Sequence, residues 1–293
     1  MNSKNPLSAR LIYPCMMISA IGIHYLLIDS GINLQWATYL PVVLSALAIS
    51  FFEWKYPYCR EWYPDRNDFS NDLIFMVLVQ VLLPRLLSFF VAVTLLATLN
   101  QNCLTINLGW PHEWPVAVQV ILMLLAADFL RYWLHRAAHE WVHPLWRLHA
   151  VHHSPQKLYW LNVGRFHPVE KSIQYLFDAL PFIFLGISEE VLALYFVFYS
   201  VNGFFQHCNI ELRLGFLNYI VSGPELHRWH HSRKIEQSNR NYGNNLIIWD
   251  TLFGTRYLPE NKQVGELGLI NRHYPQSFLA QMKTPFVKDL DQR

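Results

Sequence analysis

Residues 128–153 read DFLRYWLHRAAHEWVHPLWRLHAVHH, and this stretch holds six of the fourteen histidines of the chain. Positions i, i+3 and i+4 of an α-helix lie on one face, so histidines at these spacings point into a common space. The stretch contains two such motifs, and a third follows a long apolar segment: His135-x-x-x-His139, His149-x-x-His152-His153 and His227-x-x-His230-His231. We therefore expect the chain to gather these side chains at one site.

The three histidine motifs predict a transition-metal site. Neutral imidazole is the commonest protein ligand for such metals, and several imidazoles at this spacing favour Fe, Zn or Cu over Mg or Ca. One His-x-x-x-His pair arises in helices by chance, whereas three motifs in one chain do not. A single metal needs three or four protein ligands, and the motifs offer twice that number. The surplus predicts two metals.

The composition predicts an integral membrane protein. Of 293 residues, 53% are hydrophobic and only 15% are charged, against about a quarter charged in soluble domains. The formal net charge of +2 and the lack of any long basic run argue against a nucleic-acid partner. No cysteine spacing indicates a zinc ribbon or haem attachment, so we expect reduced thiols at Cys15, Cys59, Cys103 and Cys208.

Four apolar segments are long enough to cross a bilayer, which takes about 20 residues: 11–28, 34–52, 73–99 and 114–134. They form two hairpins, and the turns at 29–33 and 100–113 contain no Lys or Arg. The positive-inside rule then places both termini and every histidine motif on the cytoplasmic side. The expected location is the inner membrane of a bacterium, or the endoplasmic reticulum of a eukaryote.

Two apolar regions carry interruptions. Pro84-Arg85 falls inside the third span, where we expect a kinked helix with Arg85 reaching a polar interior; a substrate contact is the alternative. Residues 173–206 are broken by polar residues, which favours a short hairpin that dips into the membrane over two full crossings. The prediction is one all-α domain, 1–293, with a transmembrane base (11–134) and a helical cytoplasmic cap, the catalytic region covering 115–260.

Further side chains are candidates for the site. His207 ends the second apolar half of 173–206, and His167 begins a helix before Pro168, so both are candidate ligands. Asp128 precedes His135 by two helical turns and is expected to orient a ligating histidine. Alternatives for that task, or for a bridging ligand, are Glu140, Glu170, Glu211 and Glu225, and His143 is a candidate for an outer position. The sequence indicates no role for His24, His112 and His273.

The chemistry of two nitrogen-ligated metals at a membrane face favours oxygen activation. Zinc hydrolysis is the rival, but His-Glu-x-x-His is absent and one catalytic zinc would leave most of the histidines unexplained. A haem would need histidines facing each other within the spans. A transporter would place ligands within its spans near the bilayer midplane, whereas only His24 lies inside a span here.

The order and detail of the chain's motifs resemble those of the fatty acid hydroxylase and sterol desaturase superfamily. Within this superfamily the chain is most similar to the branch that contains alkylglycerol monooxygenase. The motifs are His135-Arg-Ala-Ala-His139, His149-Ala-Val-His152-His153-Ser154, Arg165-Phe-His167-Pro168, His227-Arg-Trp-His230-His231, Asn241-Tyr-Gly and Ile248-Trp-Asp-Thr-Leu-Phe-Gly-Thr255. The resemblance implies a membrane di-iron histidine-box oxygenase acting on a lipid, with two Fe ions for which Zn can substitute. The ligands it implies are His135, His139, His149, His152, His153, His167, His207, His227, His230 and His231.

One departure from the family and one missing part bear on the mechanism. Some members carry a second histidine four residues after the position of His207, where this chain has Glu211, so the partition of ligands between two irons stays open. No sequence motif for a cytochrome b5, a dinucleotide or an iron–sulfur cluster is present. An external electron donor is implied: a ferredoxin or cytochrome system, or by analogy with the branch a tetrahydropterin.

The leading hypothesis is a monooxygenase that uses O2 to hydroxylate a C–H bond of a fatty acyl, alkyl or sterol-like lipid. A desaturase with the same site is the alternative, because both reactions begin with the same hydrogen abstraction. A non-catalytic metal-binding or transport protein is the alternative of another class. Aromatic side chains of the cap are candidates for a lipid channel or for interfacial anchors: Trp141, Trp146, Tyr159, Trp160 and Trp229.

Overall fold

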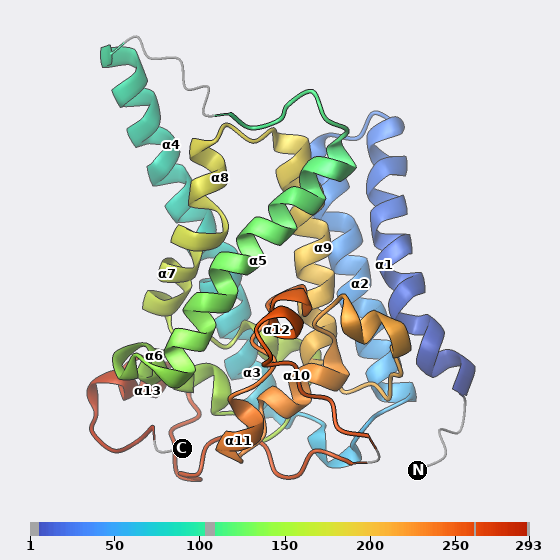
Figure 1. The fold of residues 1–293 in the computed structure, drawn as a ribbon, viewed down its shortest axis with the longest axis vertical. Coiled ribbons are helices and arrows are strands. Elements are labelled where there is room, and N and C mark those ends of the chain that lie inside the picture. Colours follow the sequence, from blue (N-terminus) through green and yellow to red (C-terminus); the bar gives the residue numbers. More distant parts are fainter. Residues whose placement is uncertain (1–5, 103–108, 261, 292–293) are drawn as a thin grey trace.

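The computed structural model describes residues 6–102, 109–260 and 262–291 as a bundle of long helices with a cap of short helices at one end (Figure 1). No strand occurs in these ranges, and three isolated bridges are the only β pairing there. The prediction of an all-α protein is confirmed. Of the residues singled out above, Cys103 and positions 103–108 of the second turn lie outside the described residues, as do positions 1–5 and 292–293 of the two ends.

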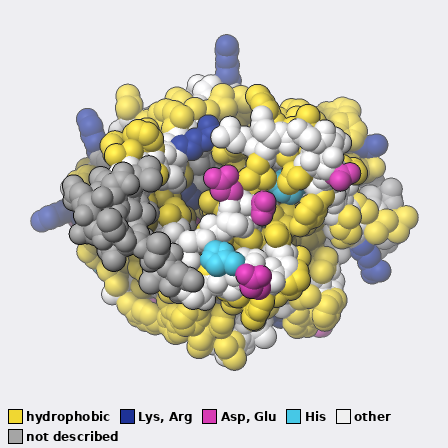
Figure 2. Space-filling view, turned by 90° about the horizontal axis from the view of Figure 1, so that it is seen from above, with side chains coloured by type: hydrophobic (Ala, Val, Ile, Leu, Met, Phe, Trp, Pro, Cys, Tyr) yellow, Lys and Arg dark blue, Asp and Glu magenta, His cyan; other side chains and the backbone are white. Residues whose placement is uncertain are grey.

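Four helical segments are long and apolar enough to cross a membrane, as predicted. They are α1 (Pro6–Asp29), α2 (Leu34–Lys55), a composite helix of α3 (Arg66–Phe75), η2 (Met76–Leu82) and α4 (Leu83–Asn102), and α5 (Val116–Glu140). Figure 2 looks down on the end where α1 finishes and α5 starts, and hydrophobic side chains occupy most of its outline. Such a belt is what a helix bundle presents to lipid.

Short polar sequences set the ends of these helices. Asn33 caps α2 by accepting a hydrogen bond from the Trp36 N–H at 3.0 Å, and Gly31, with φ of 78°, makes the turn from α1 possible. Asp65 and Asp68 form a reciprocal capping box at the start of α3. The hairpin boundaries of the first two spans therefore follow from the sequence.

The third span contains a π-helical segment directly before its proline. η2 has i→i+5 hydrogen bonding over Met76–Leu82, and Pro84 follows two residues later. Proline has no N–H to donate and disrupts the helical ladder beside it, so a local change of helix type is a physical response to it. The Arg85 guanidinium lies over the Tyr39 ring, 4.6 Å from the centroid, and Arg85 lines an internal cavity of the bundle.

Residues 143–207 form a second layer against α5. It contains α6 (His143–His153), η3 (Trp160–Gly164), α7 (Pro168–Asp178), α8 (Leu180–Phe184) and α9 (Glu189–His207). The turn between α8 and α9 lies at the same end of the bundle as the α1–α2 turn (Figure 1). A hairpin within 173–206 is thus present, and how deeply it enters the membrane stays a prediction.

α9 is the central helix of the bundle. Apolar residues of α1 and α2 pack on one side of it, around Val197, Val201 and Phe205, and residues of α5 pack on another, around Leu194. All four of these side chains are buried. This packing fixes where α9 ends, and therefore where His207 lies relative to the end of α5.

The cap consists of short elements that lie where α5 and α9 end (Figure 1). Two long-range contacts of Glu53, at the end of α2, attach it: the Glu53 carboxylate accepts hydrogen bonds of 2.8 Å from the N–H groups of Trp160 and Asn209. The short helices are η1 (Arg60–Trp62), η4 (Gly215–Tyr219), α10 (Pro224–His230), α11 (Ile235–Ser238), α12 (Ile248–Leu252), α13 (Phe278–Gln281) and η5 (Thr284–Phe286).

Candidate metal centre

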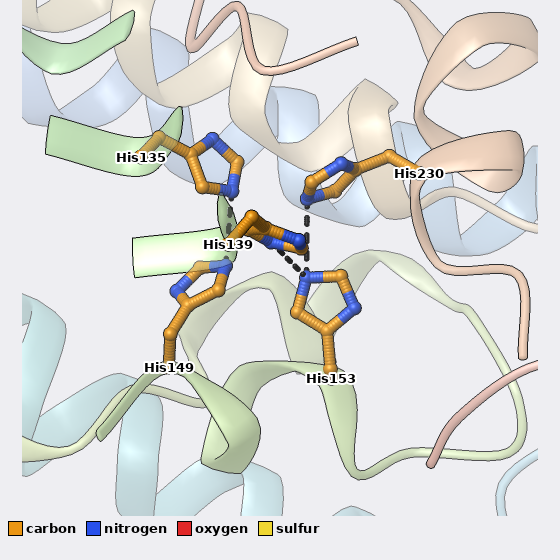
Figure 3. A group of neighbouring side chains, drawn as sticks. All are labelled: His135, His139, His149, His153 and His230. Atoms are coloured by element: carbon orange, nitrogen blue, oxygen red, sulfur yellow. Dashed lines mark hydrogen bonds between the residues drawn. The ribbon is translucent and has the colours of Figure 1, made fainter. Parts of the chain in front are cut away.

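Nine histidines converge into two neighbouring groups at the junction of bundle and cap. Within each group one ligand atom per residue lies within 4.8 Å of all the others. The first histidine group, drawn in Figure 3, consists of His135, His139, His149, His153 and His230. The second histidine group consists of His152, His207, His227 and His231. All nine side chains are buried except His135, which is partly buried.

Helix geometry explains how the second and third motifs each serve both groups. Neighbouring residues on a helix point about 100° apart, whereas residues four apart share a face. On α6, His149 and His153 therefore face the first group, and His152 faces the second. At α10 the same pattern is reversed, because His227 and His231 face the second group and His230 the first. The expectation of one common space per motif is confirmed for His135 and His139 and is wrong for the other two motifs.

The inward nitrogens lie at distances typical of metal ligands. In the first group Nε2 of His135 and His149 are 2.9 Å apart, and Nε2 of His153 is 3.1 Å from Nε2 of both His139 and His230 (Figure 3). In the second group the Nε2 atom of His227 is 3.1 Å from that of His207 and 3.0 Å from that of His231. Nitrogens about 2.1 Å from one metal are about 3.0 Å apart when they subtend a right angle.

The outward nitrogens of six histidines are held by oxygen atoms. Backbone carbonyls accept from the Nδ1 atoms of His135 (Tyr242, 2.8 Å), His230 (Arg240, 2.8 Å) and His152 (Arg165, 3.3 Å). The side chains of Asn162, Asn239 and Glu170 pair with the Nδ1 atoms of His207, His139 and His149 at 2.7, 3.2 and 2.6 Å. A carbonyl can only accept, so Nδ1 carries the proton and Nε2 keeps its lone pair.

These tautomers make a bound cation the natural partner of each group. Lone pairs that face each other at about 3 Å repel unless a proton or a metal lies between them. Protonation is disfavoured, because burial lowers the pKa of His230 to about 4 and lowers the pKa of His153, His227 and His231 well below the ordinary value. An all-imidazole donor set of this kind suits iron, zinc or copper. The residues present therefore fit two transition-metal ions.

Asp128 holds a loop and does not contact a histidine. Its carboxylate accepts hydrogen bonds from the Asn245 and Leu246 N–H groups, at 2.7 and 2.5 Å, and from the Asn245 side chain. Asp250 holds the preceding part of the same loop through the N–H groups of Tyr242 and Gly243. Because the Tyr242 carbonyl accepts from His135, the two aspartates position a ligand through the backbone.

Sequence reasoning missed a second support, formed by Arg165 and Asp72. The Arg165 guanidinium donates to the Asp72 carboxylate at 2.6 and 2.5 Å, and both side chains are buried. The Arg165 carbonyl in turn accepts from His152. The arginine was visible in the Arg165-Phe-His167-Pro168 motif, but its acid comes from a helix 93 residues earlier in the sequence.

The remaining candidates lie outside both groups. His167 uses both ring nitrogens locally: Nδ1 accepts from the Val169 N–H at the start of α7 and Nε2 lies 3.3 Å from the Met282 carbonyl. Glu211 belongs to neither group. Glu140 accepts from the Tyr242 hydroxyl, Glu225 accepts from the Leu214 N–H, and His143 pairs with Asp291 at the surface.

A cavity of about 490 Å³ connects the histidines with the membrane-facing side of the bundle. His135 and His149 of the first group and His152 and His227 of the second line it. Its apolar wall comes from α2 and η2. Val43, Leu47 and Val81 line the cavity and are 53, 64 and 37% exposed, from which we infer that the cavity opens sideways between these helices. Of the five cap aromatics considered above, Trp160 is the one that lines it.

Four candidate spans, two histidine groups and a cavity that reaches both describe a membrane protein with a candidate metal centre. The profile of the fatty acid hydroxylase family matches residues 120–255, which include every histidine of the two groups. The chain belongs to this family, as the resemblance indicated.

Curated relatives agree with that assignment. The chain is 36% identical over 282 residues to the ornithine lipid hydroxylase OlsE of Rhizobium tropici, and the match covers 94% of this chain and 83% of that protein. It is 34 and 33% identical to the alkylglycerol monooxygenases of Xenopus tropicalis and Homo sapiens, over 56% of this chain and 35% of each of those proteins. No solved structure matches the chain.

Proposed function

We propose that this protein is a di-iron monooxygenase that hydroxylates a C–H bond of a polar membrane lipid. In the overall reaction one atom of O2 enters the C–H bond, and the other leaves as water after taking up two electrons and two protons from an external donor. The observation that carries the proposal is the opening of one lateral cavity onto both histidine groups. Relatives named as ornithine lipid and alkylglycerol oxidising enzymes support a lipid with a polar head as substrate.

In this reaction the residues of the chain would hold the metals, position the lipid and keep water out of the site. The two groups would each hold one iron, and the irons together would supply the redox chemistry that activates O2. Val43 and Leu47 admit an aliphatic chain from the bilayer, so the substrate reaches the site without crossing water. The oxygen atoms behind six of the imidazoles, three of them backbone carbonyls and one the Glu170 carboxylate, keep those ligands oriented.

The electrons come from another molecule in this proposal. The sequence contains no cysteine spacing typical of an iron–sulfur cluster and no glycine fingerprint of a dinucleotide site. A ferredoxin or cytochrome system and a tetrahydropterin are the candidate donors. The catalytic region would face the cytoplasm, where such donors are available.

The test is the incorporation of labelled oxygen. Membranes of cells that produce the wild type, His152→Ala or His230→Ala would be supplied with isotopically labelled O2, and their lipids compared by mass spectrometry. The proposal requires a lipid that gains one labelled oxygen atom with the wild type and with neither variant. A lipid that loses two hydrogens without gaining oxygen would identify a desaturase. Identical lipids in all three membranes, with iron bound to the wild type, would favour a non-catalytic metal protein.

A further inference from the structure

The cavity has chemically different ends. Toward the start of α2 it is lined by apolar side chains, among them Val42, Val43 and Leu47. Next to the histidines the lining is polar and comes from α5, α7, α9 and the 244–245 loop: Arg131, Glu170, Gln174, Gln206, Asn244 and Asn245. An amphiphile with a donor-bearing head that enters from the bilayer matches these linings with its chain along α2 and its polar group beside the histidines.

The polar end contains buried atoms that no described residue satisfies. They are Oε2 of Glu170, Oε1 of Gln174 and Nδ2 of Asn244. Glu170 and Gln174 are 8 and 3% exposed. Buried polar groups in native proteins nearly always have a partner, and those without one cost free energy until a ligand or water supplies it. Two of the three atoms are acceptors on neighbouring turns of α7 and the third is a donor, so a ligand with N–H or O–H donors would satisfy the first two.

Glu170 and Gln174 each have one side-chain atom fixed by a hydrogen bond and one acceptor atom without a partner. Glu170 Oε1 already accepts from His149 Nδ1 at 2.6 Å and from Gln174 Nε2 at 2.9 Å. The two bonds lock both side chains and leave one acceptor atom on each. Glu170 contacts the first histidine group directly, through its hydrogen bond to His149. A lipid head bound to Glu170 would therefore lie beside the first histidine group.

We propose that Glu170 and Gln174 bind the donor-bearing polar head of the lipid, so that oxygen is inserted at a carbon next to this head. The inference rests on the proposed function and adds the direction in which the substrate binds. The reaction balance is unchanged: C–H becomes C–O–H, and the second oxygen atom leaves as water with electrons and protons from the external donor. The opposite orientation would place an anionic head at Arg85, at the far end of the cavity, and would oxidise the methyl end of the chain.

The experiment uses three probes with the same saturated chain: an ornithine lipid with N–H donors, a 1-alkylglycerol with O–H donors, and a fatty acid methyl ester with none. Their equilibrium binding to the iron-loaded protein in detergent is measured first. The position of any inserted oxygen is then found by fragmentation mass spectrometry. Gln174→Met removes the free acceptor and keeps the side-chain length, and Gln80→Met is the matched control, because Gln80 lines the same cavity from η2.

The wild type and Gln80→Met are expected to bind at least one donor-bearing probe about tenfold more tightly than the methyl ester. In Gln174→Met most of this preference should disappear while the iron content stays the same. Oxygen should enter within a few carbons of the head. Equal binding of all three probes, or oxygen near the methyl end, would overturn the inference while leaving a lipid hydroxylase. Selective binding without any oxygenated product would instead support the polar subsite and contradict the proposed function for these lipids.

Discussion

The Nδ1 atom of His149 donates a 2.6 Å hydrogen bond to Oε1 of Glu170, which joins α6 to α7 directly behind the first histidine group. A carboxylate in this position fixes the ring and raises the basicity of the inward nitrogen, and loss of such a partner weakens metal binding about 10- to 100-fold. Glu170→Leu should therefore lower the affinity of the first histidine group for its metal by this factor. Competition with a chelator measures it.

The matched control for this prediction is Glu170→Gln. Its amide oxygen still accepts from His149, so metal affinity should remain closer to that of the wild type. The second histidine group contains no contact to Glu170 and should keep its metal in both variants. Equal affinities in Glu170→Leu and the wild type would show that the hydrogen bond does not support the metal.

The ion pair of Asp72 and Arg165 predicts a stability effect. Both side chains are buried, and Arg165 would be left without its carboxylate in Asp72→Ala. Breaking a buried pair from one side costs about 3–5 kcal/mol, which should lower the midpoint of thermal unfolding in detergent clearly. Asp68→Ala on the same helix removes a more exposed partner of Lys157 and one hydrogen bond of the α3 capping box, and should cost only about 1 kcal/mol. Similar midpoints for the two variants would contradict this assignment.

The position of His167 predicts a capping role without metal binding. Its Nδ1 accepts from the Val169 N–H at the first turn of α7. Asparagine is a good helix cap and a poor iron ligand, so His167→Asn should keep the full metal content, whereas His167→Ala should lose about 1 kcal/mol of stability. Elemental analysis and thermal unfolding check the two variants. A fall in metal content with His167→Asn would return His167 to the ligand set.

The lateral opening predicts a block by a bulky side chain. Leu47 lines the cavity and is exposed outside it, so Leu47→Trp should lower kcat/KM for a lipid by about tenfold, equivalent to about 1.4 kcal/mol, with unchanged metal content. Leu44→Trp is the control, because Leu44 lies on the same helix, is exposed and does not line the cavity. Equal loss of activity in both variants would place the entrance elsewhere.

Periodicity and spacing predict the parts of this structure that depend on local sequence. Long apolar runs give four spans, and the histidine motifs give the candidate ligands. The split of adjacent His152 and His153 between two groups could also have been derived, because neighbouring helical residues point about 100° apart. The sequence argument treated each motif as one face and did not take this step.

Other features depend on contacts between distant parts of the chain. Glu170 was one of four acids that the sequence could not rank, and its distance of 21 residues from His149 is bridged only by the fold. Asp128 lies two turns from His135 on one helix, yet it bonds to a loop 117 residues later. The π-helical segment before Pro84 adds a change of helix type that the sequence predicted only as a kink.

The central claim is that two separate histidine groups hold one iron each. Elemental analysis of protein from iron-supplied cells tests it most directly, in the wild type, in His230→Ala of the first group and in His207→Ala of the second. Two irons per chain in the wild type and one in each single variant, with none retained when both are combined, is the predicted result. One iron or none in the wild type, or the same metal lost from both single variants, would contradict it.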